Sequence, residues 1–433
     1  MGKYMTGKEL KYNNYLPILW LLSTAFTYLH LPVNIPSSIQ LPEIVFLFWL
    51  LFDFRALLDQ KKIISFITLA WPILLLGIYM LINSFLLTKE VNALYDSLVL
   101  FYLITVSFLL FSRGNFIRKT PNLWFYSLLA LVFLNGIPAI IGFVLSQFNI
   151  PNSLAFSKSS PYPIVGAFGR PLGFHYTPTM LFNNLVLPFL GLIFLKNPPE
   201  KKLKSIGLGI TITVILLTLN KHIFTLIISV IFVLYFTRQL TLKMSLFIGI
   251  GLLLFQQFNI YFTTIPSSQE PQELQTNLGG VPDCADSPIV SIGKWNLYPT
   301  YYYAMRTNQI PLLQKHWLTG IGPGQYIRHQ EKINRENPDQ PCFRSIISEP
   351  HSMWVGTLLE NGILAFLLLI IFFYQSLQRI RNIPDSNFQS RFIVGMIIFI
   401  LLAGLVTDIL NFRPFWFVIG ILYALSGNKN INS

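Results

Sequence analysis

The chain has 433 residues, of which 53% are hydrophobic and only 11% are charged. Soluble domains carry roughly 25% charged residues, so this composition excludes an ordinary soluble globular protein. The formal net charge of +13 raises the question of a nucleic-acid partner. The position of the basic residues along the chain argues against one, because they follow the pattern of a membrane topology.

The apolar residues gather in twelve blocks, several of them near the ~20 residues that a helix needs to cross the hydrocarbon core. The blocks are Tyr15–Leu31, Leu41–Phe54, Ile63–Leu87, Leu94–Phe111, Leu123–Leu145, Met180–Leu195, Ile206–Leu219, Ile223–Phe236, Met244–Phe262, Met353–Tyr374, Phe392–Leu410 and Phe415–Leu425. Only helices and closed barrels satisfy every backbone group in lipid, and these blocks are too continuously apolar for barrel strands. The sequence predicts an all-α integral membrane protein with about 12 transmembrane helices, forming one polytopic domain over residues 1–433.

The basic residues predict an orientation. With a cytoplasmic N-terminus, alternate loops place 19 of the 31 Lys and Arg residues on the cytoplasmic side and 12 on the other. Seven of those 12 lie in one long loop, which the positive-inside rule discounts, so the short-loop comparison is 19 to five. We therefore expect both termini in the cytoplasm.

That orientation puts the longest loop, Thr263–Glu349, outside the cytoplasm between the ninth and tenth spans. Loops of this length are usually functional. The aromatic-dense stretch Trp295–Trp317 is expected to contain helices lying along the membrane interface, while Pro266–Ser291 is expected to be irregular. Cys284 and Cys342 both fall in the loop, where they either form a disulfide in an oxidising compartment or remain two separate thiols.

Two hairpin tips carry polar or ionisable residues where the flanking apolar blocks are short. One tip holds Lys221 and His222, and the other is flanked by Asp408 and Arg413. Ionisable groups at membrane depth usually face the bundle interior or a wet cavity. The alternative is that flanking lysines snorkel and both tips simply reach water.

A third polar stretch, rich in Gly and Pro, runs from Gly169 to Tyr176 and contains Arg170 and His175. Cations that converge on one cavity suit a phosphate or pyrophosphate, since Arg offers a forked pair of donors and Lys a point charge. The alternative is that Arg170 pairs with lipid phosphate at the interface. The sequence leaves both interpretations open.

The most specific pattern surrounds the start of the tenth block. The motif Glu349-Pro350-His351-Ser352 follows a Gly-rich element that includes Gly320, Gly322 and Gly324. Their order resembles the O-antigen ligase and Wzy-type O-antigen polymerase superfamily, membrane proteins of about a dozen spans with a large outer loop late in the chain. The resemblance is clear over residues 316–366 and weaker over 169–183 and 411–425.

The resemblance implies a transfer of an undecaprenyl-pyrophosphate-linked glycan to a hydroxyl of a glycan or lipid acceptor on the periplasmic face of a bacterial inner membrane. It implies that His351 is the general base, since imidazole titrates near working pH. The cations expected to hold the pyrophosphate are Arg170, Lys221, Arg328 and Arg413. Arg306 is the nearest counterpart of an arginine that the family places before the Gly-rich element, but it lies closer to that element than the family pattern.

Supporting roles are expected for His175, His222, Glu360, Asp408, Gly322 and Gly324. A continuous helix from Met353 would carry Glu360 about 13 Å below His351, as a structural polar contact. Neither a cofactor nor a metal ion is expected, since the Gly-rich element lacks the Lys-Ser/Thr of a nucleotide loop and the acids near Cys284 lack a ligand cluster.

Two other function classes stay open beside this one. A polyprenyl-phosphate-sugar glycosyltransferase usually keeps an acid in its first outer loop, and residues 32–40 contain none. A lipid-linked oligosaccharide flippase or transporter often shows internal repeats, and we find none. The sequence does not separate polymerase from ligase. In every case the expected partners are membrane lipids and lipid-linked glycans.

Overall fold

The computed structural model describes residues 15–27, 39–88, 91–114, 120–155, 161–162, 166–167, 169–195, 197–267, 288–336, 350–381, 383 and 388–426. Within these ranges every predicted apolar block overlaps a helix. The helices are α2 Leu16–Ser23, α3 Leu41–Phe52, η2 Phe54–Leu58, α4 Gln60–Asn83, η3 Ser84–Thr88, α5 Val91–Phe111, α7 Pro121–Gln147, α8 Pro178–Phe194, α9 Lys201–Leu217, α10 His222–Phe236, α11 Leu242–Tyr261, α12 Tyr301–His316, α13 Tyr326–Glu336, α15 Met353–Ile380, α16 Phe388–Ala403 and α17 Arg413–Ser426. The predicted class, a mostly helical membrane protein, is confirmed.

Five helices among the described residues are long and apolar enough to cross a membrane. They are Gln60–Thr88, Ala93–Phe111, Asn122–Gln147, Leu242–Tyr261 and Met353–Ile380. Other apolar helices are shorter. At 1.5 Å per residue, the 14 residues of α17 reach about 21 Å, less than the ~30 Å of a hydrocarbon core. The predicted total of twelve spans stays a prediction.

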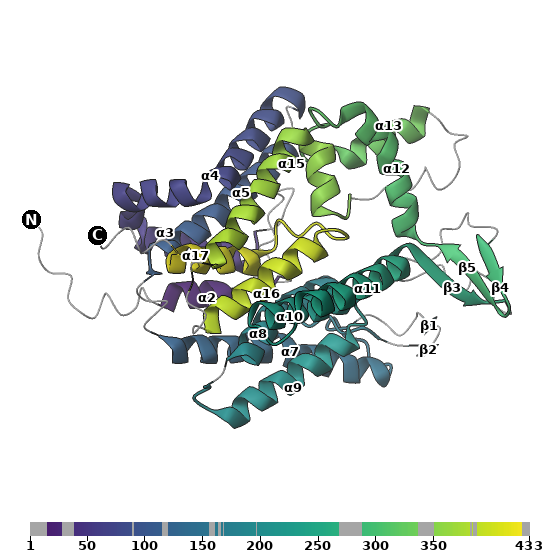
Figure 1. The fold of residues 1–433 in the computed structure, drawn as a ribbon, viewed down its shortest axis with the longest axis horizontal. Coiled ribbons are helices and arrows are strands. Elements are labelled where there is room, and N and C mark those ends of the chain that lie inside the picture. The colour runs from purple at the N-terminus through teal and green to yellow at the C-terminus, as the bar shows by residue number, and fades with distance from the viewer. Residues whose placement is uncertain are drawn as a thin grey trace, which may run out of the picture.

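The surroundings of α17 explain why it is apolar on all sides. Nearly all of its residues are buried, and it packs against α5, α15 and α16 (Figure 1). A helix that is apolar all round belongs inside a protein or a membrane. Here other helices cover α17, so protein rather than lipid accounts for its composition.

Two helices end earlier than their apolar blocks predict. α2 ends at Ser23, and α16 ends at Ala403, seven residues before the predicted Leu410. The stretch after α16 is non-helical because its carbonyl groups have other partners. Ser352 donates to the carbonyl of Gly404, Arg306 to that of Leu405, and the Met353 N–H to that of Thr407.

The predicted continuous helix from Met353 is wrong. α15 is interrupted at Gly362, whose φ of 77° and ψ of −176° are not helical. The segment 353–361 is a short helix of its own, and 363–380 is the long apolar part. The break lies after Glu360, which belongs to the short helix that begins at Met353. The rise of about 13 Å expected between His351 and Glu360 is therefore not affected by the break, and the membrane depth of Glu360 stays a prediction.

The predicted outer loop contains strands as well as helices. β3 Phe262–Pro266 pairs with β5 Trp295–Pro299, which pairs with β4 Val290–Ile292, both antiparallel. Figure 1 shows this sheet extending beyond the end of α11, away from the helices. A second, two-stranded pair joins β1 Pro161–Tyr162 to β2 Gly166–Ala167. The expectation of a helix in Trp295–Trp317 is confirmed for α12, while Trp295–Pro299 is a strand.

Candidate functional site

One face of α12 organises the site. Tyr302, Arg306 and Gln309 are spaced four and three residues apart, which places their side chains on one side of the helix. That side faces the chain segment that begins α15. α12 contacts α15 and α11, and it follows the strand β5 directly. The helix therefore presents three polar groups toward the predicted Pro350-His351-Ser352 motif.

Arg306 fixes the backbone of that motif. Its guanidinium donates to the carbonyl oxygens of Pro350 at 3.0 Å, His351 at 3.1 Å and Leu405 at 2.9 Å. Gln309 accepts from Arg306 at 2.7 Å and donates to the Pro350 carbonyl at 2.8 Å. The planar, five-donor group of arginine suits this task, because a lysine has no comparable fork.

His351 has an unusual backbone conformation. Its φ is 43°, in the left-handed region that non-glycine residues seldom occupy. Its ring meets the Tyr302 ring edge to face, with centroids 5.9 Å apart and planes at 68°. Burial raises the pKa of Tyr302, while the positive charges of Arg170 and Arg306 act in the opposite direction. Tyr302 thus lies within electrostatic reach of two arginines and in contact with the histidine.

The start of α15 is held against two other helical hairpins. Ser352 caps the helix, its hydroxyl accepting from the Val355 N–H at 3.2 Å. The Thr407 carbonyl accepts from the Met353 N–H at 3.1 Å, and the Thr407 hydroxyl is hydrogen-bonded to Nε2 of His222 at 2.8 Å. The predicted motif, the α9–α10 turn and the stretch after α16 therefore meet in one place.

Arg170 and Lys221 lie together beside this meeting point. Nε of Arg170 donates to the Thr218 carbonyl at 2.7 Å, and Nζ of Lys221 donates to the carbonyl of Asn259. Each cation senses the other's charge, as Arg170 acts electrostatically on Lys221. Arg170 also acts on Tyr302, which contacts His351. Arg170, Lys221, Tyr302 and His351 therefore come together from separate parts of the sequence.

The Gly-rich element packs on the break in α15. The N–H groups of Ile321 and Gly322 donate to the carbonyls of Leu359 and Glu360 at 3.0 and 2.8 Å. The Glu360 carboxylate accepts backbone N–H groups of Gly324 and Tyr326, and it lies near Asp96 and Asp408. Gly322 and Gly324 have φ values of 101° and 65°. The element thus contacts both the backbone and the side chain of Glu360.

The end of the Gly-rich element is tied to α12 as well. Tyr326 is hydrogen-bonded to Gln309, the same residue that supports Arg306, and its hydroxyl accepts from Gln330 at 3.1 Å. Burial raises the pKa of Tyr326 to about 12. The phenol therefore stays neutral and serves as a rigid connection between the Gly-rich element and the helix that holds His351.

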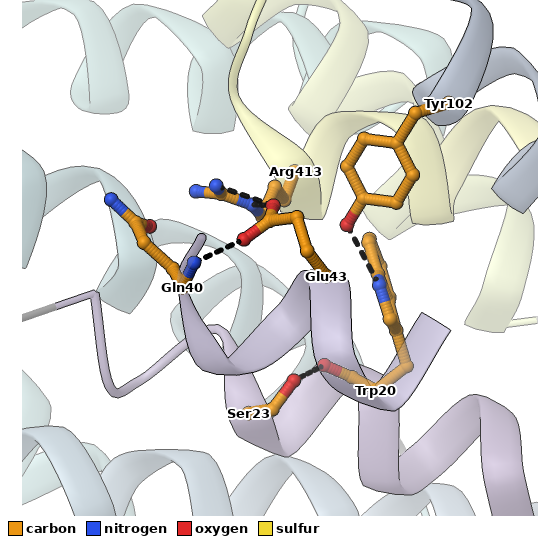
Figure 2. A network of polar contacts seen from close by, with 6 residues as sticks. All are labelled: Trp20, Ser23, Gln40, Glu43, Tyr102 and Arg413. Carbon is orange, nitrogen blue, oxygen red and sulfur yellow. Dashed lines mark hydrogen bonds and ion pairs between the residues drawn. The ribbon is translucent and has the colours of Figure 1, made fainter. Parts of the chain in front are cut away.

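Arg413, predicted to bind pyrophosphate, has an acidic partner in this structure. Its Nη2 and Nε donate to Oε1 of Glu43 at 2.6 and 2.9 Å, while Oε2 of Glu43 accepts the Gln40 N–H at 2.9 Å (Figure 2). Tyr102 also interacts with Arg413 and accepts from Trp20 at 3.0 Å. This network joins α2, α3, α5 and the first residue of α17, so Arg413 has a structural role here.

The remaining predicted residues fall in different surroundings. His175 is buried between Thr27 and Asn135, with ring nitrogens 2.9 Å from the Thr27 hydroxyl and 2.6 Å from the Asn135 amide oxygen. That oxygen only accepts, so Nε2 carries a proton. Burial lowers the pKa of His175 to about 3, which keeps the ring neutral near pH 7. Arg328 is exposed on α13. Cys284 and Cys342 lie outside the described residues. Within the loop Thr263–Glu349, residues 268–287 and 337–349 are not described.

No motif in the sequence singles out Tyr302 or Gln309, and Arg306 lies closer to the Gly-rich element than the family pattern. The signal that identifies them is their helical spacing in a segment otherwise of weak periodicity. Glu43 lies three residues beyond the predicted first outer loop, 32–40, so its acid is not apparent from the predicted topology. Comparison of the chain with models of known protein families gave no match, and comparison with curated proteins gave none either.

Proposed function

We propose that the chain is a membrane glycosyltransferase that transfers an undecaprenyl-pyrophosphate-linked glycan to an acceptor hydroxyl, as an O-antigen polymerase or ligase does. The reaction takes place on the periplasmic face of a bacterial inner membrane, with both chain termini in the cytoplasm. The observation that carries the proposal is the grouping of His351 with Tyr302, Arg306 and Arg170.

His351 acts as the general base. The acceptor oxygen attacks the anomeric carbon of the donor glycan while an imidazole nitrogen takes the hydroxyl proton. The bond between the anomeric carbon and the pyrophosphate oxygen breaks, and the undecaprenyl pyrophosphate leaves with the electron pair. Imidazole suits this step because its pKa lies near neutral pH.

Arg170 and Lys221 bind the pyrophosphate. Two cations this close repel each other, and an anion between them relieves the repulsion. As the leaving group gains charge, the same two side chains stabilise it without reorganising, which is the usual source of most of the rate enhancement. A pyrophosphate leaving group needs no metal for this purpose when cationic side chains supply the charge.

The test is a deletion strain whose surface polysaccharide is profiled and then complemented. Single lipid-linked repeats accumulate if the protein is a polymerase, and long lipid-linked chains accumulate if it is a ligase. Complementation with His351→Ala is expected to leave the profile of the deletion strain unchanged. Full restoration by this variant would exclude His351 as the base, and it is the result that a flippase would give.

A further inference from the structure

The turn between α12 and α13 exposes apolar side chains outside the proposed catalytic site. Trp317 and Leu318, directly after α12, are 51% and 59% exposed, and Ile327 in the first turn of α13 is 37% exposed. Leu312, Ile321 and Tyr326 beneath them form a small buried cluster of their own. The exposed trio therefore borders a packed apolar cluster, and nothing among the described residues covers the trio.

Basic residues surround this trio. Lys315 and Arg328 are exposed, and the rings of His316 and His329 lie 6.0 Å apart. Burial, and then the charges of His316, Lys332 and Lys315, lower the pKa of His329. α13 also carries acids, and Lys332 is paired with Glu336 at 3.8 Å. The end of α12 nevertheless concentrates positive charge that a neighbouring anion would stabilise.

The position of the turn points to the kind of anion. Gly322 packs against Thr88 and Leu87, at the end of the candidate span Gln60–Thr88, and the Leu318 carbonyl lies against Gly362, next to the long part of α15. At the end of Gln60–Thr88, Phe85 and Leu86 are 60% and 70% exposed. The turn thus lies where two apolar spans end, which is the level of lipid headgroups.

We propose that the α12–α13 turn, comprising Lys315, Trp317, Leu318, Ile327 and Arg328, docks into the headgroup layer of an anionic phospholipid bilayer. Trp317, Leu318 and Ile327 enter the boundary between headgroups and acyl chains, where tryptophan is enriched in membrane proteins. Lys315 and Arg328 contact lipid phosphates. A soluble anion would use the cations and leave the apolar trio in water, so the combination favours the lipid surface. Docking also fixes the outer end of α12, the helix that carries Arg306.

The test uses the full-length protein in nanodiscs, with an environment-sensitive fluorescent amino acid in place of Leu318. The matched control carries the same residue in place of Ile292, which is 70% exposed on the projecting sheet. We expect lipids that carry a nitroxide near the headgroup to quench the label at 318 more strongly than at 292. Equal quenching at the two positions would overturn the proposal.

The lipid class is tested by composition and charge. With phosphatidylglycerol present, Lys315→Gln and Arg328→Gln are each expected to lower the docking equilibrium by about fivefold, and in phosphatidylcholine alone neither has an effect. Addition of inorganic phosphate distinguishes a free-anion site. If phosphate shifts the fluorescence at 318 in phosphatidylcholine, or if neither substitution changes quenching in phosphatidylglycerol, the anionic bilayer is not the partner.

Discussion

At the scale of single residues, the strained backbone of His351 is the most informative feature. A left-handed conformation costs a non-glycine residue roughly 1–2 kcal/mol, and such strain persists only where surrounding contacts enforce it. Arg306 and Gln309 supply those contacts through the carbonyls of Pro350 and His351. The backbone conformation of His351 therefore sets the direction of its ring, whatever the ring nitrogens bind.

His351→Gly distinguishes the role of the imidazole from the effect of the strained backbone. Glycine accepts this φ without strain, so the variant is expected to unfold at the same temperature as the wild type or slightly above it. Transferase activity in membranes is expected to fall by about 10²–10⁴-fold, the usual contribution of a positioned general base. Thermal unfolding in detergent and a product assay measure the two effects. Activity retained by this folded variant would contradict the catalytic assignment.

Arg306→Lys tests whether the hydrogen bonds of Arg306 to the backbone position His351. Lysine keeps the charge but cannot serve the carbonyls of Pro350, His351 and Leu405 together. We expect kcat to fall by about 10²-fold with KM for the donor almost unchanged, because a catalytic group displaced by about 1 Å loses that much. Arg335→Lys, at an exposed position of α13, is the matched control and should retain activity. A rise in KM alone would instead indicate direct contact with the donor.

The sequence predicted the types of residue at the site better than their partners. His351 was identified by its motif and Arg170 and Lys221 by charge in apolar surroundings, and the structure brings these three into one region. Arg413 was selected for the same reason, but its partner Glu43 lies 370 residues away in sequence. Ion pairs between distant segments leave no local pattern, so no periodicity distinguishes a ligand-binding arginine from a paired one.

At the scale of elements, the contact between the Gly-rich turn and the break in α15 depends on glycine at both positions. A Cβ on Gly320 would lie 2.3 Å from the Glu360 carbonyl oxygen, and one on Gly362 would lie 2.4 Å from that of Leu318. Both residues also have positive φ. The two segments approach each other so closely that only backbone fits between them.

Gly320→Ala is therefore expected to destabilise the protein by about 1–3 kcal/mol, since backbone must move to make room. Gly209→Ala is the control, because its Cβ meets nothing within 4 Å and the site is in the helix α9. That substitution should stabilise by about 0.5–1 kcal/mol through helix propensity. Thermal unfolding of both variants in one detergent measures the difference. Equal stability would show that the turn and the break do not pack together.

Hydropathy located the helices but not their interruptions. Every apolar block overlaps a helix, because a run of apolar residues in lipid has no other stable conformation. The break at Gly362 and the early end of α16 lie inside such runs. Both depend on hydrogen bonds from other segments, Ile321 and Gly322 in one case and Ser352 and Arg306 in the other. An average over a window of residues contains no information about those donors.

At the scale of the whole molecule, the Glu43–Arg413 pair connects opposite ends of the chain (Figure 2). Each side chain is 22% exposed, so the pair is largely shielded from water. Removing one partner leaves the other charge unpaired in apolar surroundings, which costs about 3–5 kcal/mol for fully buried pairs. Replacing both partners by apolar residues avoids this cost.

We therefore expect Glu43→Leu and Arg413→Met each to lower thermal stability, toward the lower end of that range, and the double variant to recover most of the loss. A thermal unfolding series of the four proteins in detergent gives the coupling. If the two single losses simply add in the double variant, the pair contributes little and the network of Figure 2 does not hold α3 against α17.

The orientation in the membrane rests on α11. Its 20 residues reach about 30 Å, and it joins the α10–α11 turn, which contains Arg238, to the sheet at β3. The positive-inside pattern predicts that this turn lies in the cytoplasm and the sheet on the opposite side. In a background with Cys284→Ser and Cys342→Ser, Gln239→Cys should react with an impermeant maleimide only after spheroplasts are permeabilised. Ser291→Cys should react in intact spheroplasts.

Epitope tags inserted at the same two positions give a second measurement that leaves both cysteines in place. Reaction of both positions from one side would mean that α11 does not cross the bilayer, and His351 would then lack the periplasmic exposure that its proposed substrate requires.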